Sequence, residues 1–349
     1  MQKKVLISVL TLAFALLAFQ ACKPDSNPPG PTAYKLEIPA GLPAMDIPTD
    51  NPLSVEGIAL GRKLFYDPIL SGDNTMSCGS CHKQKFAFTD STLQLSVGID
   101  GVAGMRNTMS LVNLGYQRKF FWDGGAADME SQVIGPIQNP VEMHQALPQM
   151  VQELNAHKDY PALFEKVFGS STITTPMVMR AIAQFERTLI SGNSKWDQYK
   201  RGTATLTAEE ARGKDIFEAE DKGDCTHCHS LGSTFSDFEF RNTGLDSIAV
   251  DAGRALITFL ASDSGKFKTP SLRNIAVTAP YMHDGRFKTL GECIDHYNTG
   301  FRYTTYLDGN IKRLVKGRLS PQDKADLVAF LNTLTDHEFL NNPKFAKPE

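Results

Sequence analysis

Apolar residues recur along much of this chain with the period of an α-helix. Residues 53–66 and 176–190 carry apolar side chains every three or four positions, which predicts two helices with one buried face each. Thr175 stands where an N-cap belongs, directly before Pro176. Ser320 and Pro321 predict the start of a last helix that runs through Leu334.

Two further helix starts follow from capping boxes, in which a threonine precedes a glutamate by three positions. Thr207 pairs with Glu210 in this way, and Thr289 pairs with Glu292. Another helix is expected to begin near Met143. Because alternating patterns typical of hairpins are scarce, the chain is predicted to be all-α with long loops.

The N-terminal residues 1–21 have the pattern of a signal peptide. Lysines at positions 3 and 4 precede an apolar stretch, residues 5–19, that is short for a membrane span. Residues 19–22 resemble a bacterial lipobox in which Cys22 would be lipidated, although a phenylalanine replaces the usual leucine. Cleavage near Ala21 without a lipid is the alternative. Residues 22–35 are rich in Pro, Ser, Gly and Asn, which predicts a flexible tether.

Composition and charge fit an exported soluble protein. The chain has 349 residues, enough for two domains, and its 41% hydrophobic and 21% charged residues are typical of globular proteins. The net charge of −3 becomes −5 when the two leader lysines are subtracted. This balance argues against a nucleic-acid partner. We expect a location in the periplasm or cell envelope, with membrane contact only through a lipid on Cys22.

The cysteines carry the strongest chemical signal. Four of the six form two C-x-x-C pairs, and each pair is followed at once by a histidine. This is the attachment signature of c-type haem, whereas a zinc site or a redox dithiol does not require that histidine. Two thiols add to the haem vinyl groups, and the histidine ligates the iron as proximal ligand. Cys293 is interpreted as an inert core thiol and His227 as a spacer. The two predicted covalent haem c sites are Cys78, Cys81 and His82, and Cys225, Cys228 and His229.

The two motifs belong to an internal duplication. The attachment residues, together with Phe88 and Asp90, recur 147 positions later, and residues 61–65 resemble residues 213–217. Residues 108–113 recur at 269–274, 161 positions later. The chain therefore contains two copies of one haem module. We expect two cytochrome c-like domains, residues 36–202 and 203–349.

The same offset of 161 predicts that the two haems differ. It aligns Tyr297, which could ligate iron, with Pro136, which cannot. Met282 and His283 are competing candidates for the sixth ligand of the second haem. Since no histidine lies between His82 and His144, the first haem is predicted to be open for a small molecule. Glu142 is a candidate acid/base beside it.

The chain resembles the bacterial di-haem cytochrome c peroxidase family over most of its predicted mature length. The resemblance is carried by residues 120–124, 135–137, 140–143 and 280–285. It implies that Glu142 is the catalytic acid/base, that Gln132 shares its pocket and that Trp122 relays electrons between the haems. It also implies an inter-haem calcium site at Asn107, Thr278 and the Pro280 carbonyl.

Two departures resemble the tyrosine-ligated MauG-like branch of that family. Tyr297 stands where ordinary members have a methionine ligand, and the loop after the first haem lacks their histidine. Members of this branch can direct oxidising equivalents at a protein or peptide.

Three functions are therefore weighed. The leading one is peroxide reduction to water with electrons from a small donor, a monohaem cytochrome c or a cupredoxin, through the second haem and Trp122. The second is a MauG-like oxidase that modifies a macromolecular substrate. The third is a non-enzymatic electron carrier, which the pairing of Pro136 with Tyr297 disfavours. A homodimer is compatible with the sequence, but no feature of the sequence indicates one.

Overall fold

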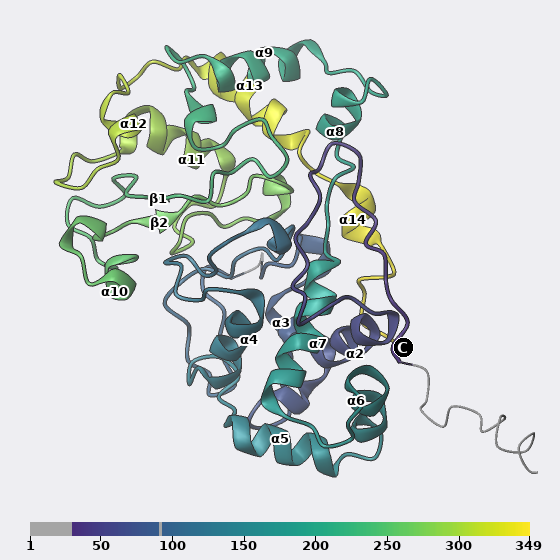
Figure 1. Cartoon of the computed structure of the whole chain (residues 1–349). Coiled ribbons are helices and arrows are strands. Elements are labelled where there is room, and N and C mark those ends of the chain that lie inside the picture. The colour runs from purple at the N-terminus through teal and green to yellow at the C-terminus, as the bar shows by residue number, and fades with distance from the viewer. Residues whose placement is uncertain (1–29, 91–92) are drawn as a thin grey trace, which may run out of the picture.

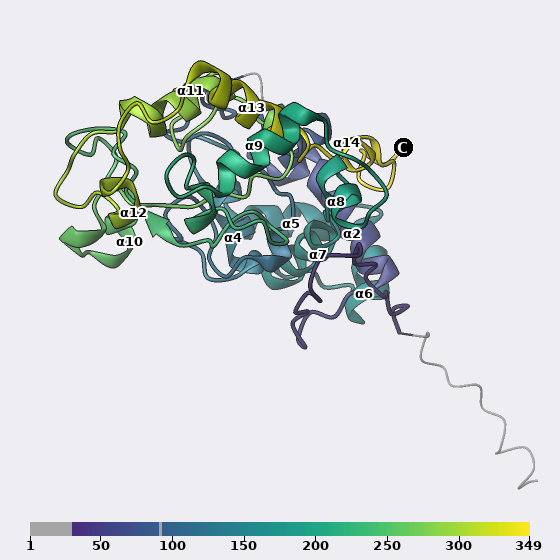
Figure 2. The same ribbon diagram turned by 90° about the horizontal axis from the view of Figure 1, so that it is seen from above.

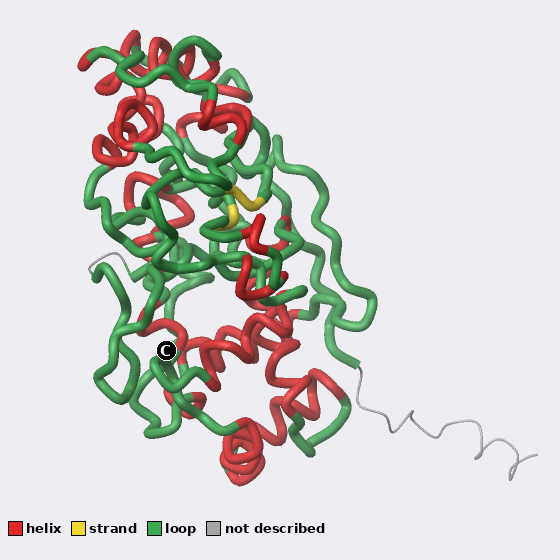
Figure 3. The backbone as a smooth tube through the Cα atoms, turned by 90° about the vertical axis from the view of Figure 1, so that its left-hand side faces the viewer, coloured by secondary structure: helices red, strands yellow, loops and turns green. Residues whose placement is uncertain are grey.

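The computed structural model describes residues 30–90 and 93–349 and is largely helical (Figure 1). The predicted signal peptide and Cys22 lie outside the described residues. Loops fill much of the middle of the molecule (Figure 3). The helices are α2 (Val55–Tyr66), α3 (Cys78–Cys81), α4 (Met129–Gln138), α5 (Leu147–Ala156), α6 (Tyr160–Phe168), α7 (Thr175–Arg187), α8 (Lys195–Lys200), α9 (Ala208–Glu218), α10 (Ala255–Thr258), α11 (Leu290–Asp295), α12 (Gly309–Lys312), α13 (Pro321–Asn332) and α14 (His337–Asn341).

Other regular elements are short. Strands β1 (Phe240–Arg241) and β2 (Phe267–Lys268) form an antiparallel pair. A π-helical turn, η7 (His296–Gly300), continues α11. Among the described residues, no helix is long and apolar enough to span a membrane. The 3-10 turns are Pro68–Leu70, Gln84–Phe86, Leu114–Tyr116, Cys225–His227, Ala261–Asp263 and Ile275–Val277.

Most predicted helices begin at the residues that cap them. The capping boxes at Thr207 and Thr289 are confirmed, since each threonine side chain accepts from the backbone N–H three residues later. The N-cap position of α7 is Thr174 rather than Thr175, one position earlier than predicted, and its side chain makes no capping hydrogen bond. Helix α13 ends at Asn332 instead of continuing to Leu334.

The helix expected to begin near Met143 does not form. The backbone N–H of Met143 donates to the carbonyl of Pro136 at 3.1 Å, so the chain folds back onto the end of α4. Met143 itself is buried in the core. The next helix, α5, begins four residues further on, at Leu147.

The duplication is visible in two helix crossings. Helix α2 packs on α7, and α9 packs on α13 in the same manner (Figures 1 and 2). At each crossing a glycine lets the backbones approach. A β-carbon on Gly61 would overlap the carbonyl oxygen of Ala181, and one on Gly213 would overlap that of Asp326. The sequence similarity of residues 61–65 and 213–217 therefore reflects the same close packing.

Each half has its own apolar core, but the chain crosses between them. Trp196 of α8 packs into the core that contains Phe217 and Phe330. Conversely, Phe339 of α14 packs into the first core, in edge contact with Phe88. Helix α8 thus packs into the second core and α14 into the first. The domain boundary between residues 202 and 203 therefore stays a prediction.

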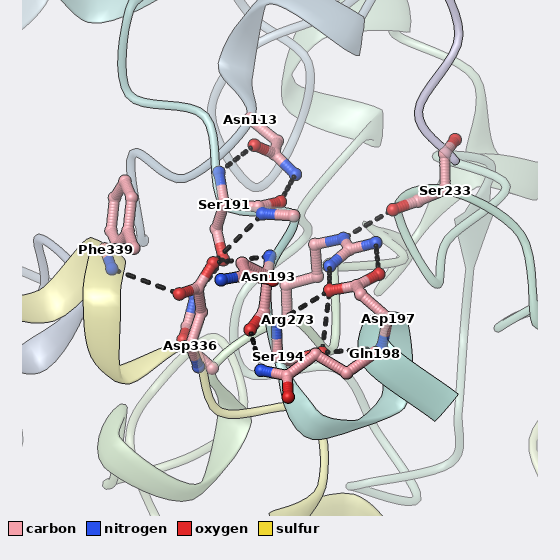
Figure 4. A network of polar contacts seen from close by, with 12 residues as sticks. Asn113, Ser191, Asn193, Ser194, Asp197, Gln198, Ser233, Arg273, Asp336 and Phe339 are labelled. Carbon is pink, nitrogen blue, oxygen red and sulfur yellow. Dashed lines mark hydrogen bonds and ion pairs between the residues drawn. The ribbon is translucent and has the colours of Figure 1, made fainter. Parts of the chain in front are cut away.

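A buried polar network joins the halves where the chain passes between them (Figure 4). Asn113 exchanges two hydrogen bonds with the backbone of Ser191, at 2.8 and 3.0 Å. Its repeat counterpart Asn274 accepts from the Asp336 backbone N–H at 2.7 Å. The Asp336 carboxylate accepts from the Ser191 hydroxyl and from the N–H groups of Gly192 and Asn193. The repeated asparagines therefore bind equivalent turns, after α7 and after α13.

The glycine crossing predicts a clear stability effect. Gly213→Ala should lower the free energy of unfolding by about 1–3 kcal/mol, because the added carbon overlaps rigid backbone. Gly309→Ala is the matched control, since no atom lies within 4 Å of a β-carbon there. Denaturant unfolding of the haem-loaded protein measures both. Equal unfolding midpoints for the two variants would contradict the crossing.

Candidate functional site

The two attachment histidines are held in the same way. The Nδ1 atom of His82 lies 2.7 Å from the carbonyl oxygen of Phe88, and that of His229 lies 2.9 Å from the carbonyl oxygen of Phe235. A carbonyl can only accept, so Nδ1 carries the proton and Nε2 keeps a lone pair for iron. Burial lowers the pKa of both imidazoles, which favours the neutral ligating form.

The loops that supply these carbonyls have the same unusual backbone. Phe88 and Phe235 both have positive φ, 59° and 52°, although neither is a glycine. Both side chains are fully buried, which holds that conformation in place. The repeated phenylalanine noticed in the sequence is thus the residue whose carbonyl orients the proximal histidine.

The second attachment site opens into a cavity of about 270 Å³. Cys225, Cys228 and His229 line it together with Tyr297. Tyr297 lies in the π-helical turn η7, a local irregularity that is frequent at functional sites. Burial raises the pKa of this phenol. The neutral histidine, the paired thiols and the apolar walls fit a haem c group. A cation facing the Tyr297 phenol would lower its pKa and so counteract the effect of burial.

The competing sixth-ligand candidates line the same cavity. Met282 and His283 both border it. The ring of His283 is stacked on Phe267, with centroids 3.6 Å apart, so it would have to leave this contact to reach a metal. Cys293 also borders the cavity rather than lying in a closed core, and burial raises the pKa of its thiol to about 12. A thiol with that pKa stays protonated, as expected for an inert cysteine.

The polar groups predicted for the first site lie on α4 and in the turn that follows it. Pro136 lies inside α4, and the helix is the repeat counterpart of α11 and η7, which carry Tyr297. The amide Nδ2 of Asn139 donates to the Glu142 carboxylate at 2.7 Å. Burial nonetheless raises the pKa of Glu142. The Oε1 atom of Gln132 is buried and has no hydrogen-bond partner in the described part of the chain.

Glu142 lies near both cysteines of the first motif. Burial raises the pKa of the Cys78 thiol, and the charges of Glu186 and Glu142 raise it further. Burial also raises the pKa of Cys81, and Asp90 and then Glu142 contribute. The charge of Glu142 therefore acts on both thiols of the first attachment site.

Trp122 lies where the two halves meet. Its indole N–H donates to the carbonyl of Asn107 at 2.9 Å, and its own carbonyl accepts from the Lys268 N–H at 2.7 Å. Conversely, the N–H of Asn107, in the first half, donates to the carbonyl of His283, in the second half, also at 2.7 Å. Trp122 and His283 are repeat counterparts, so each turn is held by the other half. Trp122 also lines the cavity of the second attachment site.

The three predicted calcium ligands border this same cavity. Asn107, Thr278 and Pro280 all line it. The Asn107 amide Nδ2 donates to the Gln94 carbonyl and the Thr278 hydroxyl to the Ile275 carbonyl, which leaves oxygen lone pairs for a cation. Within residues 30–90 and 93–349, no cluster of three or more His, Cys, Asp and Glu side chains could hold a metal. A calcium ion bound by Asn107, Thr278 and Pro280 would therefore be held by uncharged oxygen atoms.

Two charged residues beside Trp122 were missed in the sequence. Arg106 pairs with Asp123 at 2.5 Å and with Asp251 at 2.7 Å. Lys268 is only 2% exposed, and its ammonium donates to the carbonyl of Lys119. Burial lowers the pKa of Lys268 to about 7. The offset of 161 aligns Lys268 with Asn107 and could have identified this position.

None of the remaining histidines lines the cavity of the second attachment site. His144 is exposed and pairs with Asp100 at 2.6 Å. His337 is exposed as well, whereas His157 is half-buried and its ring packs on Tyr160. His227, inside the second motif, pairs with Asp224, which directly precedes that motif.

A duplicated helical chain with two such attachment sites is a di-haem c-type cytochrome, and the comparisons give its family. Residues 55–205 match the family model described as di-haem cytochrome c peroxidase. Cytochrome-c peroxidase IdrP1 of Pseudomonas sp. strain SCT is 33% identical over 97% of this chain and 93% of its own. The methylamine utilization protein MauG of Methylorubrum extorquens is 36% identical over 82% of this chain and 80% of its own.

A solved structure agrees with these relatives. The crystal structure of a MauG-like protein associated with microbial copper homeostasis covers 90% of this chain and 99% of its own, with a TM-score of 0.84 and 37% identity. The chain belongs to the di-haem cytochrome c peroxidase family. It is an oxidoreductase acting on peroxide and, as a member of this family, carries two haem c groups. The predicted family and fold class are confirmed.

Proposed function

We propose that this protein is an exported peroxidase that reduces hydrogen peroxide to water with electrons from a small redox protein. The observation that carries the proposal is the partly buried Glu142 carboxyl, whose charge raises the pKa of both the Cys78 and the Cys81 thiol. Its counterpart region in the second half presents Tyr297 to the cavity instead. This asymmetry supports one reaction site and one electron-transfer site.

Two haem c groups, held by the two C-x-x-C-H motifs, supply the redox-active iron. Glu142 acts as the proton-transfer group: its carboxylate takes the proton of one peroxide oxygen and returns it to the other. Its raised pKa brings it closer to the range in which both forms are accessible. Gln132 is proposed to share this site through its carboxamide, whose Oε1 atom is buried and has no partner among the described residues. Overall, two electrons and two protons convert one peroxide into two waters.

The remaining residues hold or connect the two sites. Trp122 is proposed as the electron relay, which its place between the halves supports. Tyr297 is proposed as the sixth ligand at the second site. Asn107, Thr278 and Pro280 are proposed to bind calcium weakly, because none of these ligands carries a charge. We further propose a periplasmic location, with a lipid on Cys22.

The MauG-like alternative rests on Tyr297 and on the similarity to MauG proteins. In that case peroxide is consumed to modify a protein or peptide, and a small donor protein is not the natural electron source. The two functions differ in how fast a reduced monohaem cytochrome supports peroxide turnover.

Replacing Glu142 tests the peroxidase proposal. With a reduced monohaem cytochrome as donor, the wild-type protein should turn over peroxide rapidly, and Glu142→Gln should be at least about 10²-fold slower, since it cannot transfer the proton. Glu165→Gln, at an exposed glutamate on α6, is the matched control and should retain full rate. Slow wild-type turnover with a long-lived oxidised protein would favour the MauG-like function.

Replacing Tyr297 tests the ligand assignment. Tyr297→Phe should abolish the tyrosine-ligated low-spin ferric signal of the second haem and leave the first haem unchanged. Tyr281→Phe is the control, because this phenol borders the same cavity but donates to the Ile275 carbonyl. Electron paramagnetic resonance of the oxidised protein measures both variants. An unaltered low-spin signal in Tyr297→Phe would transfer the assignment to Met282 or His283.

A further inference from the structure

One buried carboxyl group of the first half has no role in the account above. Glu186 is the penultimate residue of α7 and is only 4% exposed. Its Oε2 atom has no hydrogen-bond partner among the residues that the structure describes. A carboxyl group in such a place costs free energy unless it is protonated or serves a purpose.

The duplication shows what this position replaces. Phe185 and Phe330 occupy equivalent places against the crossing glycines of α2 and α9. Thr188 and Thr333 donate from their hydroxyls to the carbonyls of these phenylalanines, both at 2.6 Å. Helices α7 and α13 therefore correspond with an offset of 145, and Glu186 corresponds to Leu331.

Leu331 lines the cavity of the second attachment site. Its counterpart should therefore border the haem of the first site, and the electrostatics agree. After burial itself, the charge of Glu186 is the largest cause of the raised pKa of the Cys78 thiol. The fold thus places an acid next to the first haem where the second haem has an aliphatic side chain.

The charged groups around Glu186 are largely committed to other partners. Arg187 binds Glu130 of α4 through two contacts, at 2.8 and 3.0 Å. The hydroxyl of Tyr66, on α2, donates to the carbonyl of Phe345. Other titratable groups on elements packed against α7 are engaged elsewhere: Arg62 with the Pro343 and Ala346 carbonyls, Lys63 over the Tyr160 ring, Glu153 with Gln145 and Gln149, and Tyr116 with the Pro43 carbonyl.

We propose that Glu186 is a proton-exchanging group that sets the reduction potential of the first haem, holding a proton while this haem is reduced and releasing it when the haem is oxidised. Each electron that passes to the peroxide acceptor is then accompanied by one proton passing from the carboxyl group to solvent. The resulting carboxylate would stabilise the more positive iron, because water screens a charge at this buried position poorly. Burial raises the pKa of Glu186 to about 8, which keeps it protonated at neutral pH in the absence of that positive charge.

Glu186 acts on the first haem through its charge and is not proposed as a catalytic residue. The inference does not depend on whether a small protein or a macromolecule supplies the electrons. It requires only that haem c is attached at Cys78 and Cys81. Its test is a potential measured at equilibrium, so its failure can be told apart from a failure of the proposed peroxidase activity.

The test is a spectroelectrochemical titration of both haems in the holoprotein between about pH 6 and pH 10. In the wild type, each tenfold fall in proton concentration should favour the oxidised first haem by up to tenfold, about 59 mV for one electron. Glu186→Gln should remove this part of the pH dependence and raise the potential at high pH. Glu186→Leu, which installs the residue of the second half, should do the same.

Two comparisons make the outcome decisive. Glu209→Gln removes an equal charge from an exposed position on α9 and should leave the pH dependence of the first haem unchanged. If Glu186→Leu fails to retain haem, the nearly isosteric Glu186→Gln still decides the question. The same pH dependence in the wild type and in Glu186→Gln would overturn the proposal.

Discussion

Both haem sites depend on one hydrogen bond, from the Nδ1 of an attachment histidine to a carbonyl six residues later. It fixes the tautomer and the ring orientation, so the opposite nitrogen faces the haem side. The carbonyls belong to Phe88 and Phe235, whose left-handed backbone is held by complete burial of their rings. The glycine crossings fix the helix pairs of each half, and the asparagine-bound turns close the chain after α7 and α13.

Function arises from the places where the two copies differ. In the alignment of the two copies, Tyr297 corresponds to Pro136, Leu331 to Glu186, and Lys268 to Asn107. In each pair the copies differ in charge or ligating ability. Glu186 and Leu331 do so on equivalent helices, α7 and α13, whereas Tyr297 lies in a π-helical turn and Pro136 in the regular helix α4. A duplicated scaffold can therefore present unequal chemistry through side-chain substitutions together with small local changes of backbone.

The sequence was sufficient for the features that have a local physical cause. The attachment motifs, the capping boxes at Thr207 and Thr289 and the glycine-led repeats all follow from short-range spacing. The sequence was not sufficient where tertiary contacts decide. Met143 lies in a turn because its N–H reaches the Pro136 carbonyl, and Glu186 is buried although its residue type favours the surface. The roles of Glu142, Gln132 and Trp122 came from family resemblance, and the structure adds their burial and partners.

The central claim is that the two haems are unequal, one open and one closed by a protein ligand. Electron paramagnetic resonance of the fully oxidised wild-type protein tests it most directly, because the spin state of ferric haem reports its axial ligands. The account predicts one high-spin and one low-spin ferric signal in equal amounts. Two low-spin signals would contradict it, since the first haem would then also be closed.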